Sequence, residues 1–531
     1  MKSIFRSFIY TIASLGFGLS GIAENKAAPN IVIIICDDLN DSVAGMGGHP
    51  QAYTPHIDGL TARGVRFLNA ASNSPICGPS RASLWSGLHP VTTGLYGGKQ
   101  HQNRWYNNTI LKGKPTLFET FTRNGYHNFA TGKIHHNGHE RVEIFENPDG
   151  TRGFGSHPNF GPLPNDGEPE NKRHGVLPPW WPEAHRQSGG WGDGFGPIQD
   201  LSTYGEGYGW SMFYSGRPWQ FREGHNRDPM PDEVHAREAV EFLQKDHLAP
   251  FLLTVGFSRP HSPWYAPQEY FDLFPLETVK LTPILENDAE DCAKILTNQQ
   301  DLSEPWGWHK YEKLMKNGGE EQLRKWTQAY LACVAFVDDQ VGKVLRAIEA
   351  REDAANTLII FTSDHGYHMG EKEYLFKFTP WEESVRIPLV IAGPGVAKGV
   401  ECTRPVALLD LYPTCIDYAG MNAAYSLDGF SLRSLLENPA ANKWQGPYVS
   451  VAASGSKAPL QVNQPARPED QHFSLRSQHF RYIRCRNGEE EFYDHRSDPN
   501  EWHNEIENAE YQAQIQVMRA AFERFLKDRQ S

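Results

Sequence analysis

The chain has 531 residues, of which 39% are hydrophobic and 22% charged, and its formal net charge at pH 7 is −13. This length is sufficient for one large hydrophobic core and a smaller second domain, and the composition is typical of a folded globular protein. The acidic balance excludes the extended basic surface that nucleic acid binding requires, and it excludes a polybasic membrane-binding patch. We therefore expect no nucleic acid partner.

Residues 1–23 have the pattern of a secretory signal peptide. Lys2 and Arg6 precede an apolar stretch from Phe8 to Ala23, which ends in small residues. The alternative is an N-terminal membrane anchor, but the stretch is short for a bilayer and contains several hydroxyl side chains. We expect cleavage after Ala23, export to the periplasm or the medium, and no stable membrane insertion.

The chain contains seven cysteines, an odd number that leaves one thiol unpaired in an oxidising compartment. Cys402 and Cys415 are close enough in sequence to form a disulfide, although the sequence alone does not decide whether they do. Cys77 is the candidate for the cysteine that forms no disulfide, because it is the first residue of the run Cys-Gly-Pro-Ser-Arg, which continues to Gly87.

The first predicted strand is the β-branched run over residues 30–36, which ends in Asp37 and Asp38. The Cys77 run follows and predicts a helix start, because a proline at position 79 needs no backbone donor there. The free N–H groups of this first turn suit an anion, and Arg81 lies one turn further on. The alternative for an isolated cysteine is a small buried hydrophobic residue.

A helix is predicted over residues 116–124 and a short strand over 127–130, after which the chain continues with Gly132 to Gly138 and contains Lys133, His135 and His136. Residues 153–227 are rich in glycine, proline and tryptophan and suggest a lid-like insertion, in which the tryptophans either stack on sugar rings or fix the loop. An amphipathic helix is predicted over 232–245.

Two further buried strands are predicted, over residues 251–257 and 357–362, with a long amphipathic helix over 327–349 between them. The first strand is followed by Arg259-Pro260-His261 and the second by Asp364-His365, and Lys377 lies thirteen residues after Asp364. The carboxyl edge of an open α/β sheet is where ligands bind, so we expect these polar groups to meet there.

The end of the chain changes to short alternating strands over residues 473–476, 480–484 and 491–494, with an Asn-Gly turn signal at 487–488 and a final helix over about 509–528. We predict a large, mixed but mostly parallel α/β sheet flanked by helices over residues 28–440. A small antiparallel sheet with a helix over 445–531 is expected to pack against it.

The two acidic pairs are candidate metal ligands. Asp37, Asp38 and Asp364, with His365 beside them, offer three carboxylates without a thiolate cluster, which suits Ca²⁺ or Mg²⁺. The alternative for either pair alone is a helix cap or a water site. Lys133, His261, Lys377 and a histidine at 135 or 136 are candidates for holding an anionic group and for donating protons.

The run Cys77-Gly-Pro-Ser-Arg81 through Ser86-Gly87 resembles the signature of the formylglycine-dependent (type I) sulfatases, and the resemblance covers nearly the whole mature chain. Residues 30–40, 54–67, 363–371 and 490–504 are similar to family segments. Asp-His at 364–365, Arg-Pro-His-Ser-Pro at 259–263 and the glycine spacing around Lys133 are most similar to iduronate-2-sulfatase and its bacterial relatives. Asn40 and Ser86 depart from the family pattern, where arginine and threonine are common.

The resemblance implies an alkaline-phosphatase-like fold and conversion of Cys77 to formylglycine (3-oxoalanine) by a formylglycine-generating or sulfatase-maturing enzyme. It implies one Ca²⁺, with Mg²⁺ as the alternative, bound by the ligand set Asp37, Asp38, Cys77, Asp364 and His365. It implies catalytic roles for Cys77, Arg81, Lys133, His136, His261 and Lys377. In the implied double displacement the modified Cys77 attacks sulfur, His261 and Lys377 assist the departing alcohol, and His136 accepts a proton as sulfate leaves. The glycine spacing selects His136, with His135 as the alternative.

The expected activity is removal of sulfate from a sulfated oligo- or polysaccharide. Candidates for sugar contact are Lys99, His101, Trp264 and Trp381, and the alternative for each is a structural role. Two other functions remain open. One is hydrolysis of phosphate or phosphonate monoesters by an enzyme of the alkaline-phosphatase superfamily. The other is secreted, non-catalytic glycan binding.

Overall fold

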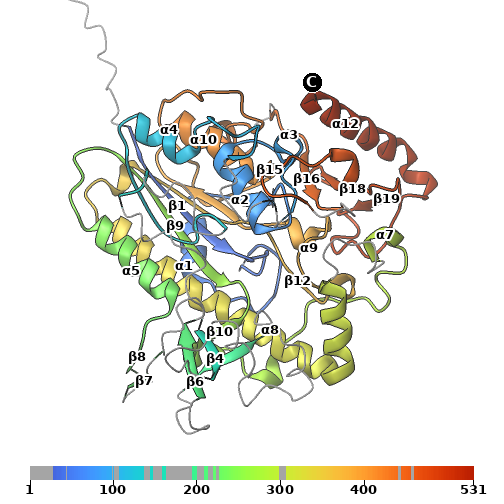
Figure 1. Ribbon diagram of the computed structural model, residues 1–531, viewed down its shortest axis with the longest axis horizontal. Coiled ribbons are helices and arrows are strands. Elements are labelled where there is room, and N and C mark those ends of the chain that lie inside the picture. Colours follow the sequence, from blue (N-terminus) through green and yellow to red (C-terminus); the bar gives the residue numbers. More distant parts are fainter. Residues whose placement is uncertain are drawn as a thin grey trace, which may run out of the picture.

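The computed structural model describes residues 28–43, 45–97, 100, 107–136, 144–146, 158–162, 194–199, 208–212, 219, 221–222, 226–297, 306–440, 444–455 and 460–530. Its centre is a seven-stranded mixed sheet with two layers of helices (Figure 1). The strand order is β15 (Val400–Ala407), β2 (Val65–Ala71), β14 (Leu389–Ala392), β11 (Thr357–Ser363), β1 (Asn30–Asp37), β9 (Phe251–Pro260) and β3 (His127–Gly132).

Strands β11, β1, β9 and β3 are parallel neighbours, and β14 joins β11 and β2 as an antiparallel strand. The three sequence segments predicted as buried strands therefore form the adjacent strands β11, β1 and β9, as expected. All eight residues of β1 are buried, because helices cover both faces of the sheet. The predicted fold class, a mixed and mostly parallel α/β sheet, is confirmed.

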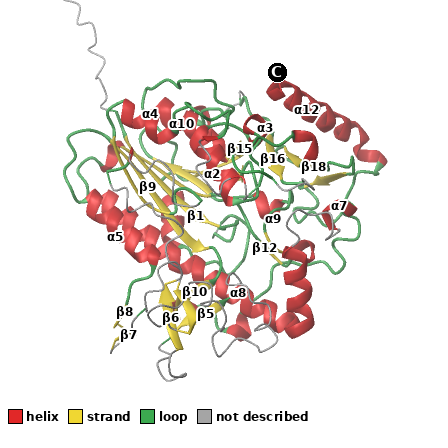
Figure 2. Ribbon diagram, in the orientation of Figure 1, coloured by secondary structure: helices red, strands yellow, loops and turns green. Residues whose placement is uncertain are grey.

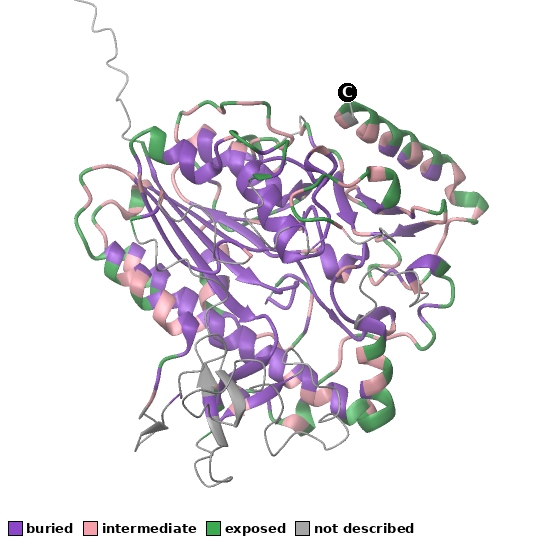
Figure 3. Cartoon of the chain, viewed as in Figure 1, coloured by how far each residue is buried: buried purple, intermediate pink, exposed green. Residues whose placement is uncertain are grey.

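Alternate residues of β1 point to two separate cores. Val32 and Ile34 pack with α1 (Pro55–Thr61), α5 (Pro231–Leu243) and α8 (Trp306–Glu349). Ile31, Ile33 and Ile35 pack on the opposite face with α2 (Cys77–Ser86), α4 (Leu117–Arg123) and α10 (Leu411–Tyr418). The burial colouring of Figure 3 follows this arrangement, with a buried sheet between helices that are exposed on their outer sides.

The remaining elements are short and lie around these layers (Figure 2). The helices are α3 (Pro90–Thr93), α6 (Gln268–Phe271), α7 (Lys294–Thr297), α9 (Glu382–Val385) and α11 (Arg433–Glu437). The strands are β4 (Pro158–Pro162), β5 (Phe195–Ile198), β6 (Tyr208–Met212), β7 (Phe221–Arg222), β8 (Asn226–Arg227), β10 (Trp264–Pro267), β12 (His368–Met369) and β13 (Leu375–Phe376).

The C-terminal part forms a four-stranded antiparallel sheet of β16 (Val449–Ala453), β17 (His472–Arg476), β18 (Phe480–Arg484) and β19 (Glu490–Asp494). Helix α12 (Gln512–Gln530) packs on it through Ile515, Met518 and Phe522. The predicted small sheet with a helix is confirmed. The sequence prediction omitted β16, which pairs with β17.

Three details differ from the sequence-based expectations or complete them. Helix α8 begins at Trp306 rather than 327, and Gly319 interrupts it with φ 57° and ψ −147°. All seven cysteines are buried and none forms a disulfide, so Cys402 and Cys415 are unpaired. In the described part of the chain, no helix combines the length and apolar composition needed to span a membrane. The expected signal peptide lies outside the described residues.

Candidate active site

The polar residues that follow the central strands meet at one edge of the sheet. Asp37 ends β1, Asp364 follows β11, and Lys133 follows β3. The backbone N–H of Asp38 donates to Asp364 Oδ1 over 3.3 Å, although the two residues are 326 positions apart. Parallel neighbours bring their carboxyl ends together, and this topology produces the cluster that the sequence predicts.

Cys77 lies at the first residue of α2, against this cluster. Its Sγ atom lies 3.4 Å from Asp37 Oδ1, 3.1 Å from His365 Nε2 and 3.3 Å from Lys377 Nζ. The side chain is 2% exposed. Burial raises the pKa of the thiol, and the nearby Asp37 carboxylate raises it further. An unmodified Cys77 is therefore a protonated thiol and a poor nucleophile at neutral pH.

The donor set is compatible with a hard divalent cation. One ligand atom from each of Asp37, Asp38, Cys77 and His365 lies within 4.8 Å of each of the others. Among the described residues nothing donates a hydrogen bond to the buried Asp38 Oδ2 atom. A buried carboxylate oxygen without a donor, facing other carboxylates, fits an oxygen-ligated calcium or magnesium ion.

Two lysines, Lys133 and Lys377, each form an ion pair with one of the acids Asp37 and Asp38. Lys133 Nζ donates to Asp37 Oδ2, and Lys377 Nζ donates to Asp38 Oδ1. Burial alone would raise the pKa of Asp37, but Lys133, with smaller contributions from His261 and Arg81, holds that pKa well below its usual range. Burial raises the pKa of Asp38 to about 7 even though Lys377 opposes the increase.

His365 is oriented as a neutral ligand. Burial lowers the pKa of its imidazole to about 4, so the ring is uncharged at neutral pH. Its Nδ1 atom lies 2.9 Å from the Gly366 carbonyl oxygen, and a hydrogen bond there leaves the Nε2 lone pair facing Asp38 and Cys77. In metal-binding histidines, a hydrogen bond at the ring nitrogen that does not face the metal fixes the tautomer and the orientation of the ring.

Arg81 braces the acidic cluster. The sequence places Arg81 one turn after Cys77, and the family resemblance implies a catalytic role for it. The structure pairs Arg81 Nε with Asp364 Oδ2 at 2.9 Å, while Nη1 donates to the Lys133 carbonyl oxygen. The side chain is 1% exposed, and its Nη2 atom is buried and makes no hydrogen bond within the described part of the chain. Arg81 therefore holds two strand ends together and keeps one N–H₂ group for an anion.

His261 lies beside the cluster, with Nε2 3.9 Å from Asp38 Oδ2 and 7% of its surface exposed. Arg259, two residues earlier, holds the His261 backbone, and Asp232, which the sequence analysis did not single out, holds the residues just before it. Arg259 Nη1 donates to the His261 carbonyl oxygen over 2.7 Å. Asp232 accepts the N–H groups of Ser258 and Arg259 at 2.8 Å each.

The two candidate histidines after β3 have different surroundings. His135 is 6% exposed and lies edge-on to the Phe118 ring, with 5.8 Å between centroids. His136 is half-buried. Since Phe118 belongs to the core between the sheet and α4, His135 has a packing role.

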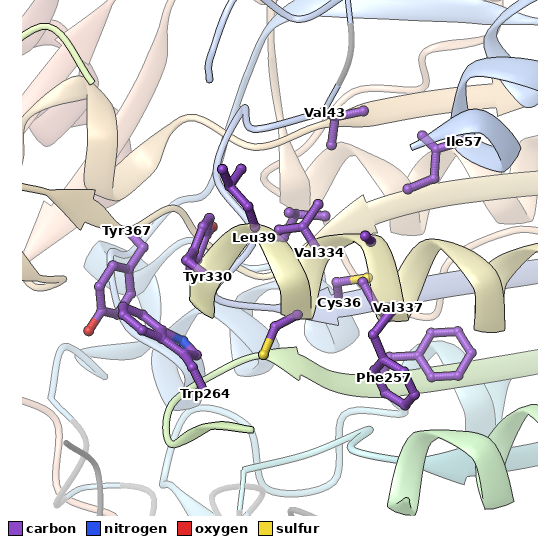
Figure 4. Close-up of a cluster of buried hydrophobic side chains, with 14 of the residues drawn as sticks. Cys36, Leu39, Val43, Ile57, Phe257, Trp264, Tyr330, Val334, Val337 and Tyr367 are labelled. Atoms are coloured by element: carbon purple, nitrogen blue, oxygen red, sulfur yellow. The ribbon is translucent and has the colours of Figure 1, made fainter. Parts of the chain in front are cut away.

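The candidates for sugar contact fall into two groups. Lys99 and His101 lie outside the described residues. Trp264 and Trp381 have 0% and 1% of their surface exposed, so neither ring offers a face to a sugar, and the expectation of sugar contact is wrong for both. Trp264 packs against Tyr330 and Tyr367 in the core (Figure 4), and Trp381 donates to the buried Glu491 carboxylate at 2.8 Å.

Tyr330 of α8 also supports the site and was not predicted. Its hydroxyl donates to the Asp38 carbonyl oxygen over 2.8 Å and accepts from the Asn40 N–H over 3.0 Å. These bonds hold Asp38 at a φ of 64°, a left-handed conformation that a non-glycine residue rarely adopts. No local sequence signal links Tyr330 to Asp38, because 292 residues separate them.

Comparisons with known proteins agree with this geometry. The profile of the family described as Sulfatase matches residues 29–421, and that of N-sulphoglucosamine sulphohydrolase, C-terminal, matches residues 370–528. A sulfatase of Formosa agariphila is 32% identical over an alignment of 502 residues, which covers 93% of this chain and 86% of that protein. Iduronate 2-sulfatase of Mus musculus is 29% identical over an alignment of 409 residues, which covers 73% of this chain and 64% of that protein.

A similar solved structure is a protein in complex with its substrate D-glucosamine-2-N,6-O-disulfate. It superposes with a TM-score of 0.65 at 21% identity and covers 95% of this chain and 98% of that one. At 21% identity this likeness concerns the fold alone.

Proposed function

The chain belongs to the sulfatase family and is a sulfuric ester hydrolase, and we propose that it removes sulfate from a sulfated carbohydrate with a nucleophile formed from Cys77. The observation that carries this proposal is the position of Cys77 Sγ within 3.4 Å of Asp37, His365 and Lys377 together. The side chain at position 77 therefore lies between a carboxylate that can bind a cation and a lysine that can bind the sulfate anion.

In this proposal Asp37, Asp38, Asp364 and His365 hold the divalent cation, and Cys77 is the residue that a maturing enzyme converts to formylglycine. The bound ion and the hydrated aldehyde would supply charge neutralisation of the sulfate oxygens and a hydroxyl nucleophile. Lys133 keeps Asp37 ionised for this purpose. Arg81 orients Asp364 and offers its Nη2 group to the anion.

Proton transfer is assigned to groups at the rim of the cluster. Lys377 and His261 approach Asp38 from two sides and are the donors for the departing sugar oxygen. A sugar alcohol is a poor leaving group, so protonation of its oxygen lowers the barrier substantially. His136, which is half-buried in the loop after β3, is the base that accepts a proton as sulfate leaves in the second displacement.

A sulfated oligo- or polysaccharide is the proposed substrate. It is supported by the predicted export signal and by relatives whose names include iduronate 2-sulfatase. A similar structure holds a disulfated glucosamine, which is a small sulfated sugar. Calcium is the proposed ion, because carboxylate oxygens dominate the ligand set.

The test is expression together with a formylglycine-generating enzyme, followed by mass analysis of the tryptic peptide 67–81, which contains Cys77. We expect the aldehyde at Cys77, calcium-dependent turnover of aryl sulfate and of defined sulfated glycans, and loss of both activities in Cys77→Ala. Faster turnover of aryl phosphate or phosphonate would assign the enzyme to those esters instead. An unmodified thiol with glycan binding but no turnover would support a non-catalytic glycan-binding protein.

A further inference from the structure

Lys372 is a buried lysine that lies outside the cluster around Cys77. It is 2% exposed, and its Nζ atom donates to Asp288 Oδ1 over 2.7 Å and to the Glu501 carbonyl oxygen. Its backbone N–H donates to Asp288 Oδ2 over 3.1 Å, and its ammonium lies 5.2 Å from the centre of the Tyr493 ring. Lys372 thus joins the segment after α6 to two residues of the C-terminal part.

The loop that carries Lys372 has an unfavourable backbone. Strands β12 and β13 form a short hairpin, in which His368 pairs with Phe376. Lys372 and Glu373 in the turn have φ values of 57° and 53°, and Phe376 and Phe378 have 144° and 85°. Non-glycine residues in these regions cost free energy and persist only where surrounding contacts hold them. The hairpin therefore depends on its anchors for its conformation.

This hairpin positions Lys377. Residue 377 directly follows β13, and its carbonyl oxygen accepts a hydrogen bond from the Tyr374 hydroxyl at 3.0 Å. Tyr374 is fully buried and its N–H donates to the Glu371 carbonyl oxygen in the turn over 3.1 Å. The hydrogen bonds of Tyr374, together with the backbone of β13, therefore connect the anchored turn at Lys372 to Lys377. The Lys377 Nζ atom in turn contacts Asp38 and Cys77.

We propose that Lys372 is a positioning residue for the leaving-group step: by fastening the β12–β13 hairpin to Asp288 and to the Glu501 carbonyl oxygen, it places the Lys377 ammonium beside the departing oxygen. This inference rests on the proposed role of Lys377 in the preceding section. It assigns the C-terminal part a task in catalysis, because Glu501 and Tyr493 belong to that part. Figure 1 shows β12 near α9, on the side of the main sheet that faces β18 and β19.

A residue that only stabilises the fold would behave differently from a positioning residue. Loss of folded enzyme lowers the rate by the same factor for every substrate. Displacement of Lys377 lowers the rate most for esters whose leaving alcohols need a proton and least for esters whose leaving groups depart as stable anions. The dependence of kcat on the leaving group therefore separates the two roles.

The experiment measures kcat and KM for a series of sulfate esters, from 4-nitrophenyl sulfate to alkyl and sugar sulfates, with calcium-loaded, formylglycine-containing enzyme. The variant is Lys372→Met combined with Asp288→Asn, which removes the ion pair without leaving a buried charge unpaired. The matched control is Lys294→Met, an exposed lysine near Asp288 whose ammonium binds the Glu290 carbonyl oxygen.

For the double variant we expect kcat to fall about 100-fold for sugar sulfates and less than about threefold for 4-nitrophenyl sulfate, with KM nearly unchanged. The control should match wild type for all esters. In the crystal structure of the double variant, Lys377 Nζ should leave its contacts with Asp38 and Cys77. An equal loss for all esters, or a Lys377 that keeps both contacts, would overturn the proposal.

These outcomes are distinct from failure of the proposed function. If wild type prefers phosphate esters, the proposed sulfate ester activity is refuted. The same series of leaving groups, measured with phosphate esters, then still tests the role of Lys372. If wild type turns over no ester, the position of Lys377 Nζ in the two crystal structures decides the inference by itself.

Discussion

Replacement of Glu501 by glutamine tests the buried ion pairs that Glu501 makes within the C-terminal part, next to α9. The Glu501 carboxylate accepts hydrogen bonds from Arg481 Nε, from His495 Nε2 at 2.8 Å and from the Glu382 N–H at 2.9 Å. Burial alone would raise its pKa, but Arg481, followed by His495, lowers the pKa from 4.5 to about 2. The folded state therefore favours the ionised carboxylate.

A carboxylate whose pKa is lowered by folding stabilises the protein fully above its unfolded-state pKa of 4.5, and this contribution is lost as the pH falls toward 2. The difference between these pKa values corresponds to about 3 kcal/mol at neutral pH. At a pH of about 3.5 the same relation leaves about 2 kcal/mol, because the carboxyl group is then mostly protonated in the unfolded chain only.

We therefore expect the difference in unfolding free energy between wild type and Glu501→Gln to shrink by roughly 1 kcal/mol on acidification from pH 7 to about pH 3.5. Urea unfolding followed by tryptophan fluorescence at both pH values measures it. The control is Glu523→Gln, because Glu523 pairs with Arg484 at 2.6 Å on the exposed surface and should contribute less than about 1 kcal/mol. A difference for Glu501→Gln that does not change with pH would refute the reasoning.

Four further substitutions test the candidate active site and the core beside it. Arg81→Lys removes the fork that orients Asp364, and calorimetric titration should show calcium affinity lowered about 10- to 100-fold; unchanged affinity would contradict the bracing role. His136→Ala should lower kcat at least about 100-fold, whereas His135→Ala should mainly lower Tm, and the reverse pattern would identify His135 as the base. Trp264→Phe should leave KM unchanged and lower the unfolding free energy by about 1–3 kcal/mol, since the Pro260 carbonyl oxygen loses its donor; a raised KM at unchanged stability would restore a sugar-binding role.

Much of the fold was predictable because its central strands are runs of mostly apolar residues followed by polar ones. Residues 30–36, 251–257 and 357–362 each predicted a buried strand, and each forms part of the parallel core. The C-terminal hairpin was predictable from its Asn-Gly turn. The beginning of α8 was not, because Gly319 and the polar residues around it weaken the helical pattern.

The sequence by itself determined which chemical groups stand at the strand ends, since Asp37, Asp38, Asp364, Lys133 and His261 each follow a run that must become a strand. It also supplied the Cys77 segment, whose residue order resembles a family signature. These are local properties, and local patterns are sufficient to predict them.

Only the tertiary structure decided how these groups are supported. Tyr330, Asp232 and Lys372 touch partners that lie 26 to 292 residues away in the sequence, and no periodicity or motif encodes such contacts. For the same reason the sequence left Trp264 open between sugar contact and a structural role, because a sequence does not show whether an aromatic ring faces a cleft or a core. Side-chain environment depends on which distant segments pack together, and packing is settled only when the whole chain has folded.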